Sequence, residues 1–229
     1  MNNTMITPSW KEQRIGWVYF ALQLLVLPTA VILLLNLLPF PLTEAQQNVV
    51  FFVLNFFCVT LIFFRYLKAS LGRLAENLSA CLGTAAAGFG LYYLGQVLVG
   101  LAITWFYPNF RNVNDMTIQV MVQENFLPMA ISTIFLVPVA EETLYRGLLF
   151  GSLSKKSLPF AYLVSTLVFC AIHVAGYVGV YPLGLLALCF CQYLPAGIFL
   201  AWAYHRSGTI CTSMLIHMVV NAIGILAMR

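Results

Sequence analysis

Charged residues are scarce in this chain of 229 residues. Only 8% are Asp, Glu, Lys or Arg, whereas 62% are hydrophobic; a typical soluble domain has about 25% charged residues. This composition excludes an ordinary soluble fold and predicts one membrane-embedded domain over residues 1–229, with the lipid bilayer as a partner. The net charge of +4 is small and no basic run is present, which argues against binding of nucleic acid.

Several motifs of enzyme and metal chemistry are also missing. The chain has no H-E-x-x-H for a zinc metalloprotease helix, no G-x-S-x-G for a serine hydrolase and no C-x-x-C pair. The six cysteines lie mostly within apolar runs, which is typical of small core residues. The first apolar stretch lacks a clear signal-peptide cleavage site, so we expect it to remain as an uncleaved span.

Seven segments have the length and apolar character of membrane spans, which need about 20 residues each. They predict an all-α, polytopic helix bundle, in which Pro28 kinks the first helix; an eighth, re-entrant element stays open. The expected spans are Ile15–Leu38, Asn48–Phe64, Gly83–Tyr107, Phe126–Phe150, Leu158–Tyr177, Leu183–Tyr204 and Thr209–Met228.

Lysine and arginine are concentrated in the segments on one side of the expected bundle. These are the segment before the first span and the loops after the second, fourth and sixth spans, which hold Lys11 and Arg14, then Arg65, Lys68 and Arg73, then Lys155 and Lys156, then Arg206. The positive-inside rule therefore predicts a cytoplasmic N-terminus and an external C-terminus. The longest polar stretch, Asn112–Gln123, fits either a short interfacial helix or a plain loop.

Six strongly polar residues stand out within the last four expected spans: Glu141, Glu142, Arg146, His173, His217 and Asn221. Such residues are costly in lipid, so each needs a reason. Residues four apart share a helix face, which pairs Glu142 with Arg146 and aligns His217 with Asn221. Glu141 points about 100° away from Glu142 and has no cation of its own on the helix.

This set has the chemistry needed for peptide hydrolysis. A buried carboxylate with an imidazole can activate water, and a second imidazole with a carboxamide can stabilise an oxyanion. No span contains aspartate, which excludes an aspartate dyad within them. We expect no cofactor, although Glu141, His173 and His217 together would also be a possible zinc set.

The same residues resemble those of a known family. Glu141-Glu142-Thr143-Leu144-Tyr145-Arg146 matches E-E-x-x-x-R, the segment ending at His173 matches F-x-x-x-H through Phe169, and His217 to Asn221 matches H-x-x-x-N. These are motifs of the CPBP family, the CAAX proteases and bacteriocin-processing enzymes also called the Abi family. The likeness covers approximately residues 126–229, which we interpret as a protease-like core.

The resemblance implies an intramembrane glutamate protease that needs no metal. Glu141 would activate water with help from His173, and His217 and Asn221 would form the oxyanion hole. Glu142 and Arg146 would hold the site together, and Phe169 would form its wall. We expect a polar cavity between the fourth, fifth and seventh spans that opens toward the cytoplasm.

The substrate class is a hypothesis drawn from the family. We expect a multi-pass protein of a bacterial plasma membrane that cleaves an unprenylated peptide or membrane-protein tail. The alternatives are a non-enzymatic immunity factor or scaffold, in which the same side chains form a buried polar network, and a small proton-relay transporter. The sequence leaves the oligomeric state open.

Overall fold

The computed structural model describes residues 4–229, in which the regular secondary structure is helical, apart from one isolated bridge between Val178 and Tyr181. In chain order the elements are α1 (Trp10–Leu25), α2 (Leu27–Leu35), α3 (Glu44–Ile62), α4 (Phe64–Glu76), α5 (Leu78–Phe106), α6 (Val113–Glu124), α7 (Phe126–Ile131), η1 (Ser132–Leu136), α8 (Val137–Glu141), η2 (Glu142–Phe150), α9 (Gly151–Ser154), α10 (Leu158–Ala175), α11 (Leu183–Ser207) and α12 (Ile210–Ala227). The two η segments are π-helical.

The number of spans agrees with the sequence. Within residues 4–229, six helices are long and apolar enough to cross a membrane, and α1 with α2 makes a seventh if this bent pair is one span. The bend between them is 58° and lies next to Pro28, which cannot donate a helix hydrogen bond. The all-α bundle of about seven spans is thus confirmed, whereas its orientation in the membrane stays a prediction.

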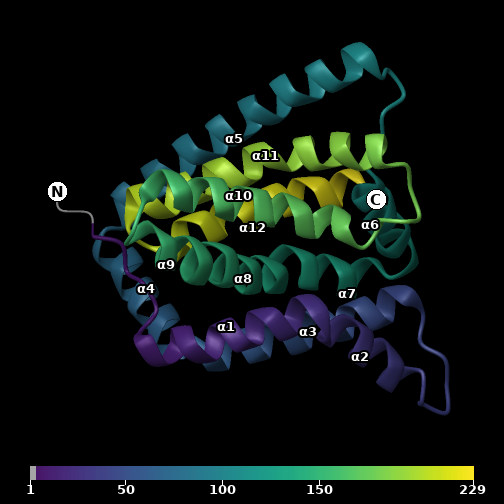
Figure 1. Cartoon of the computed structure of the whole chain (residues 1–229), viewed down its shortest axis with the longest axis horizontal. Coiled ribbons are helices and arrows are strands. Elements are labelled where there is room, and N and C mark those ends of the chain that lie inside the picture. The colour runs from purple at the N-terminus through teal and green to yellow at the C-terminus, as the bar shows by residue number, and fades with distance from the viewer. Residues whose placement is uncertain (1–3) are drawn as a thin grey trace.

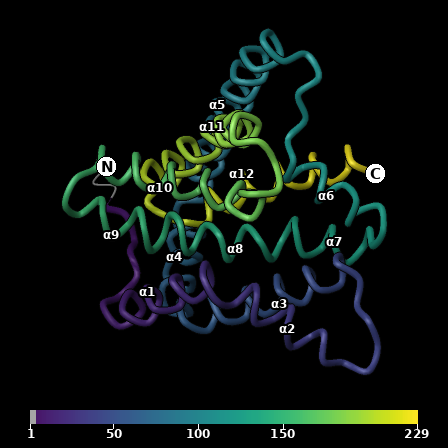
Figure 2. Tube along the Cα trace, turned by 45° about the vertical axis from the view of Figure 1, so that its right-hand side comes forward, coloured from purple at the N-terminus to yellow at the C-terminus, as the bar shows by residue number. Residues whose placement is uncertain are grey.

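The fourth span, Phe126–Ser154, runs through the middle of the molecule. Figures 1 and 2 show α1, α2 and α3 on one side of it, and α10, α11 and α12 on the other, with α5 outside α11. The close packing of α10 on α11 depends on Gly197, because a side chain there would come within 2.6 Å of Thr166. This close contact holds α10, which contains His173, against α11.

The two ends of the bundle differ in charge. Ile6 donates a backbone hydrogen bond to Gly208, whose positive φ of 75° ends α11, and Gly208 lies beside Arg73. We call this the basic end, and the opposite end, which holds α6 and the C-terminus, the α6 end (Figure 1). Eight of the eleven Lys and Arg residues lie near the basic end: Lys11, Arg14, Arg65, Lys68, Arg73, Lys155, Lys156 and Arg206.

The polar stretch after the third span is a helix. Asn112 caps α6, because its side-chain oxygen accepts from the backbone N–H groups of Asn114 and Asp115. Of the two readings of this segment, the short helix is therefore the one observed. A helix here satisfies backbone groups that a loop near the membrane would leave unpaired.

The main core surrounds the second half of the fourth span. Every residue from Glu142 to Phe150 is buried, and aromatic side chains of neighbouring helices pack around them, including Phe63, Tyr66 and Tyr204. All six cysteines are free thiols, four of them buried and two half-buried, which agrees with their prediction as core residues. The candidate site lies next to this core.

Candidate active site

The fourth span is not a regular α-helix at the site, and Pro138 shows why. In η1, Val137 donates its N–H to Ser132, five residues back. The next residue in that register is Pro138, which has no N–H to donate to Thr133. The Thr133 carbonyl therefore needs another partner, and π-helical segments of this kind often occur at functional sites.

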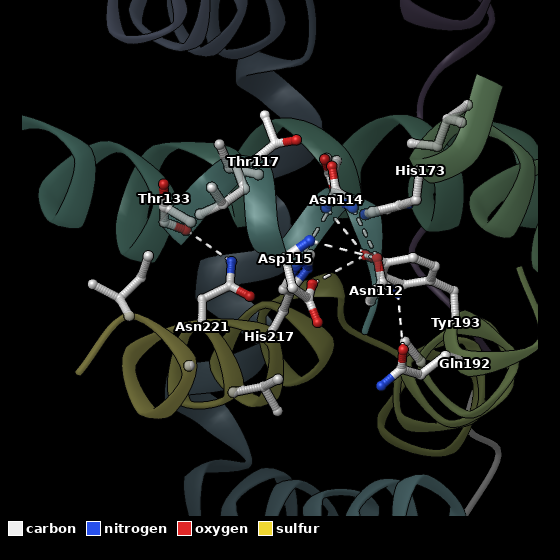
Figure 3. A pocket seen from close by; sticks show the side chains of 18 of the residues that line it. Asn112, Asn114, Asp115, Thr117, Thr133, His173, Gln192, Tyr193, His217 and Asn221 are labelled. Atoms are coloured by element: carbon white, nitrogen blue, oxygen red, sulfur yellow. Dashed lines mark hydrogen bonds and ion pairs between the residues drawn. The ribbon is translucent and has the colours of Figure 1, made fainter. Parts of the chain in front are cut away.

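Asn221 of α12 supplies that partner. Its Nδ2 donates to the Thr133 carbonyl oxygen at 2.8 Å, as the dashed line in Figure 3 shows. The amide nitrogen carries two N–H groups, so one remains for another acceptor. Asn221 thus joins two helices as well as lying at the site.

Glu142 and Arg146 form the predicted ion pair. The Arg146 Nη1 donates to Glu142 Oε1 at 2.9 Å, and both side chains are fully buried. Arg146 also donates through Nη2 to the Ala196 carbonyl of α11, and its guanidinium lies 4.0 Å from the centre of the Phe169 ring. We call Glu142, Arg146 and Phe169 the ion-pair cluster.

His217 links this cluster to Glu141. Its Nδ1 lies 2.9 Å from Glu142 Oε1, and its Nε2 lies 4.0 Å from Glu141 Oε2. An ionised carboxylate can only accept, so the proton of a neutral His217 ring lies on Nδ1 and is donated to Glu142. Nε2 then faces Glu141 at a distance too long for a direct hydrogen bond and short enough for one water to contact both atoms.

His173 is held in a similar way. Its Nδ1 lies 2.7 Å from the Phe169 carbonyl oxygen, an acceptor, so Nδ1 carries the proton and Nε2 is left free. The ring stacks on Tyr193 at 4.2 Å between centroids and contacts Phe169 at 4.6 Å. Both histidines thus use Nδ1 to fix the ring and leave Nε2 for other partners.

Glu141 differs from its neighbour. Its side chain is 19% exposed, and its buried Oε2 has no hydrogen-bond partner among the described residues. A buried acceptor without a partner calls for an explanation, such as an ordered water or a ligand. Glu142 Oε2 and Arg146 Nε also lack a partner among the described residues, but only Glu141 of these three lines the cavity. Glu141 is therefore the carboxylate that a water or substrate in the cavity can reach.

A cavity of about 440 Å³ brings the predicted residues together, which is within the size range of small-molecule sites. Glu141, His173, His217 and Asn221 all line it, and Phe169 forms part of its wall. The ion pair of Glu142 and Arg146 lies behind the wall, outside the lining. The roles of these residues stay predictions, but their side chains share one space.

The cavity does not extend in the predicted direction. We expected it to open toward the end rich in Lys and Arg, but its lining follows the other halves of the helices. On α12 it runs from His217 to Met228, and on α10 from Phe169 through Tyr177 just beyond the helix. These segments lead to the α6 end, so the expected opening at the basic end is wrong.

More helices line the cavity than predicted. Besides the fourth, fifth and seventh spans, α3, α5, α6 and α11 contribute side chains. Figure 3 shows the polar wall, which we define as Asn112, Asn114, Asp115, Gln192 and Tyr193. Sequence reasoning missed Gln192, and also Gln96, although each is a polar residue within an apolar span, the same signal that identified Glu141.

Hydrogen bonds hold the polar wall together. Asn112 donates to Gln192 at 2.9 Å, Asn114 donates to the Tyr193 hydroxyl at 3.0 Å, and that hydroxyl lies 3.3 Å from Asp115 Oδ1. Burial raises the pKa of the Asp115 carboxyl above its ordinary value, and the hydrogen bond from Tyr193 lowers it by less. These contacts join α6 to α11 across the mouth of the cavity.

The alternative of a zinc site gains no support from the geometry. Among residues 4–229, no three His, Cys, Asp or Glu side chains are grouped closely enough to hold a metal ion. His173 and His217 both line the cavity with Glu141, but they do not converge on one point as ligands would. A catalytic zinc is held by three protein ligands and a water in the fourth tetrahedral position, an arrangement that these side chains do not form here, and the absence of a cofactor stays a prediction.

Comparison with known proteins agrees with the motifs. Residues 123–223 match the family of type II CAAX prenyl endopeptidase Rce1-like proteins. The chain is also 28% identical over 89 residues to the UPF0177 protein YxdF of Lactococcus lactis subsp. lactis, a match that covers 39% of this chain and 44% of that relative. The alignment thus spans less than half the length of the relative. No solved structure matches this chain.

Proposed function

We propose that the protein is an intramembrane endopeptidase. The reason is that residues 123–223 of this chain belong to the CPBP family and match its Rce1-like members. The protein would hydrolyse a peptide bond with water activated by Glu141. One observation carries the proposal: the Glu141 carboxylate, which no described residue hydrogen-bonds, lines one cavity together with two histidines and an asparagine. The neighbouring Glu142 lies outside that lining, where Arg146 and His217 hold its carboxylate.

The proposed reaction begins at Glu141. Water that donates one hydrogen bond to Glu141 and the other to the Nε2 of His173 attacks the carbonyl carbon of the scissile bond, and Glu141 takes one proton from it. The new C–O bond turns the carbonyl oxygen into an oxyanion. When the C–N bond breaks, Glu141 returns the proton to the leaving nitrogen, so that acid and amine products balance. The hydrogen bond to His173 orients the water, and His217 Nε2 stays available for the oxyanion.

Stabilisation of the oxyanion falls to Asn221 and His217. Asn221 donates the N–H that Thr133 does not use. His217 can donate from Nε2 only while its ring carries both protons, because Nδ1–H is already given to Glu142. Removal of one oxyanion donor typically lowers kcat by about 100- to 1,000-fold.

The ion-pair cluster has a supporting role in this proposal. Glu142 fixes the His217 ring, Arg146 balances the charge of Glu142, and Phe169 separates Arg146 from the cavity while contacting His173. These residues position the catalytic groups and do not touch the substrate, with the exception of Phe169, which lines the cavity.

The main test compares two neighbouring glutamates. In Glu141→Gln the side chain keeps its shape but cannot take a proton, so we expect a loss of cleavage of about 100- to 10,000-fold, the usual contribution of a general base. Its thermal unfolding should match that of the parent protein. In Glu142→Gln the buried Arg146 loses its counter-charge, so we expect a lower unfolding temperature.

Cleavage can be followed without knowing the natural substrate. Purified protein in lipid nanodiscs would be incubated with a library of internally quenched, unprenylated peptides, and with a farnesylated C-a-a-X peptide as a second probe. Full activity of Glu141→Gln on every peptide that the parent protein cleaves would exclude the proposal. Activity that a metal chelator abolishes would exclude its metal-independent form.

The alternative is a membrane immunity factor or scaffold with a buried polar network. It predicts that Glu141→Gln keeps its biological effect, because a neutral amide can still fill the cavity and form hydrogen bonds. The position of Glu141 favours the enzyme, because its carboxylate lines the cavity together with both histidines and Asn221.

A further inference from the structure

The direction of the cavity and the distribution of charge together identify the side from which substrate reaches Glu141. The lining on the fourth span consists of Thr133, Val137 and Glu141, which run from the half of that span nearer α6 to its middle. Gly224 and Met228, near the C-terminus, line the cavity at the same end of the bundle. The way from the membrane surface to Glu141 therefore begins at the α6 end.

The basic end is closed. Between the cavity and this end lies the main core, in which Tyr145, Leu148, Phe150, Tyr204 and Ile210 have no exposed surface. Packed interiors of this kind leave few spaces large enough for a water molecule. A peptide could not reach Glu141 from the basic end without unfolding this core.

Charge assigns sides to the two ends. Eight of the eleven Lys and Arg residues lie near the basic end, one, Arg146, lies inside the core, and only Arg111 and Arg229 lie near the α6 end. Lysine and arginine are enriched in cytoplasmic loops. The α6 end would then face away from the cytoplasm.

The polar wall indicates what passes it. Asn112, Asn114, Gln192 and Tyr193 offer amide and hydroxyl groups, which can both donate and accept hydrogen bonds. Such groups match the main chain of an extended peptide. A prenyl chain lying against the polar wall would remove water from these groups without replacing their hydrogen bonds, which is costly, whereas the apolar part of the lining, which includes Phe52 and Ile118, can contact apolar side chains of the peptide.

From these observations we infer that the cavity takes an extended, unprenylated peptide segment from the non-cytoplasmic side, past the polar wall at the α6 end. The inference rests on the proposed endopeptidase function for its chemistry, whereas the route is a property of the structure. The substrate is thus a secreted peptide or the external segment of a membrane protein, two sources that share the same peptide chemistry.

Two glycines provide a matched test of the route. Gly224 lines the cavity near the α6 end, and Gly83 lines a separate hollow beside Arg73 and Arg206 at the basic end. A Cβ added at either position meets no heavy atom within 4 Å, so both cysteine variants should fold. Each would be exposed to a membrane-impermeant sulfonated maleimide in right-side-out and inside-out vesicles, with the parent protein as the baseline for the native cysteines.

We expect Gly224→Cys to be labelled in right-side-out vesicles and Gly83→Cys only in inside-out vesicles. The reverse pattern overturns the inference, and so does a Gly224→Cys that no reagent reaches from either side. An epitope tag after Arg229 gives a second measurement of sidedness, because the C-terminus lies at the α6 end (Figure 1). External protease should remove it from right-side-out vesicles.

The same vesicles separate the route from the chemistry. An internally quenched, unprenylated peptide that the purified protein cleaves should be hydrolysed when it is added to right-side-out vesicles and left intact by inside-out vesicles. Glu141→Gln should abolish this hydrolysis without changing the labelling of Gly224→Cys. Correct labelling without any Glu141-dependent hydrolysis would refute the proposed function and leave the route, whereas hydrolysis by inside-out vesicles alone would refute the route and leave the function.

Discussion

Glu141 and Glu142 are adjacent in sequence but lie in two different environments. Glu142 is fully buried, and its Oε1 lies 2.9 Å from both Arg146 and His217. Glu141 lies at the cavity, and its Oε2 has no hydrogen-bond partner among residues 4–229. The comparison teaches that one carboxylate can stabilise a membrane-embedded site while its neighbour stays free to react, because about 100° of helix rotation separates them.

The largest effect should come from loss of the ion pair that stabilises the buried Glu142. Arg146→Ala leaves the Glu142 carboxylate buried without its cation, so we expect the free energy of unfolding to fall by roughly 3–5 kcal/mol. Thermal or denaturant unfolding of the purified protein would measure it. Arg65→Ala, at an exposed arginine of the basic end, is the control and should change stability little. If both variants unfold alike, the ion pair does not stabilise the site.

Asn221 tests whether one residue can both stabilise the fold and take part in catalysis. If it donates to the oxyanion, Asn221→Ala should lower kcat by about 100-fold or more and leave KM nearly unchanged. The lost hydrogen bond to the Thr133 carbonyl should cost only about 1 kcal/mol of stability. A variant that is less stable but has normal kcat would show that Asn221 only holds α12 to the fourth span.

The smallest effect concerns Asp115 at the mouth of the cavity. Its pKa is raised by burial, so the unfolded chain loses this proton at a lower pH than the folded protein does. Stability should therefore decrease as pH rises from the unfolded to the folded pKa, and then level off. Asp115→Asn should remove this decrease and make the variant slightly more stable than the parent protein at neutral pH. Unfolding temperatures would be measured from acidic to neutral pH, and the same decrease in the variant as in the parent protein would contradict this assignment.

The sequence accounts for much of the fold. Hydrophobic length predicts about seven spans, and Pro28 predicts the bend between α1 and α2. Both signals are local, because a bilayer requires each crossing segment to be apolar and internally hydrogen-bonded. Helical spacing likewise predicts the pairing of Glu142 with Arg146, which needs no knowledge of other helices.

The site could be predicted only in part. Spacing and motifs identify Glu141, His173, His217 and Asn221, and these four line one cavity. Pro138 also contains a signal that sequence reasoning did not use, since a proline in this span must release a carbonyl. Which side chain would satisfy that carbonyl depends on α12, which begins more than 70 residues later.

The amino-acid sequence by itself determined that this chain crosses a membrane several times and that its last four spans contain acid, base and amide groups at helical spacing. Only the tertiary structure decided that His217 gives its Nδ1 to Glu142, that α6 closes on α11 through the polar wall, and that the cavity extends to the α6 end and not the basic end. The reason is physical: composition and periodicity act along one helix, whereas the direction of a cavity depends on how several helices rotate and pack against one another.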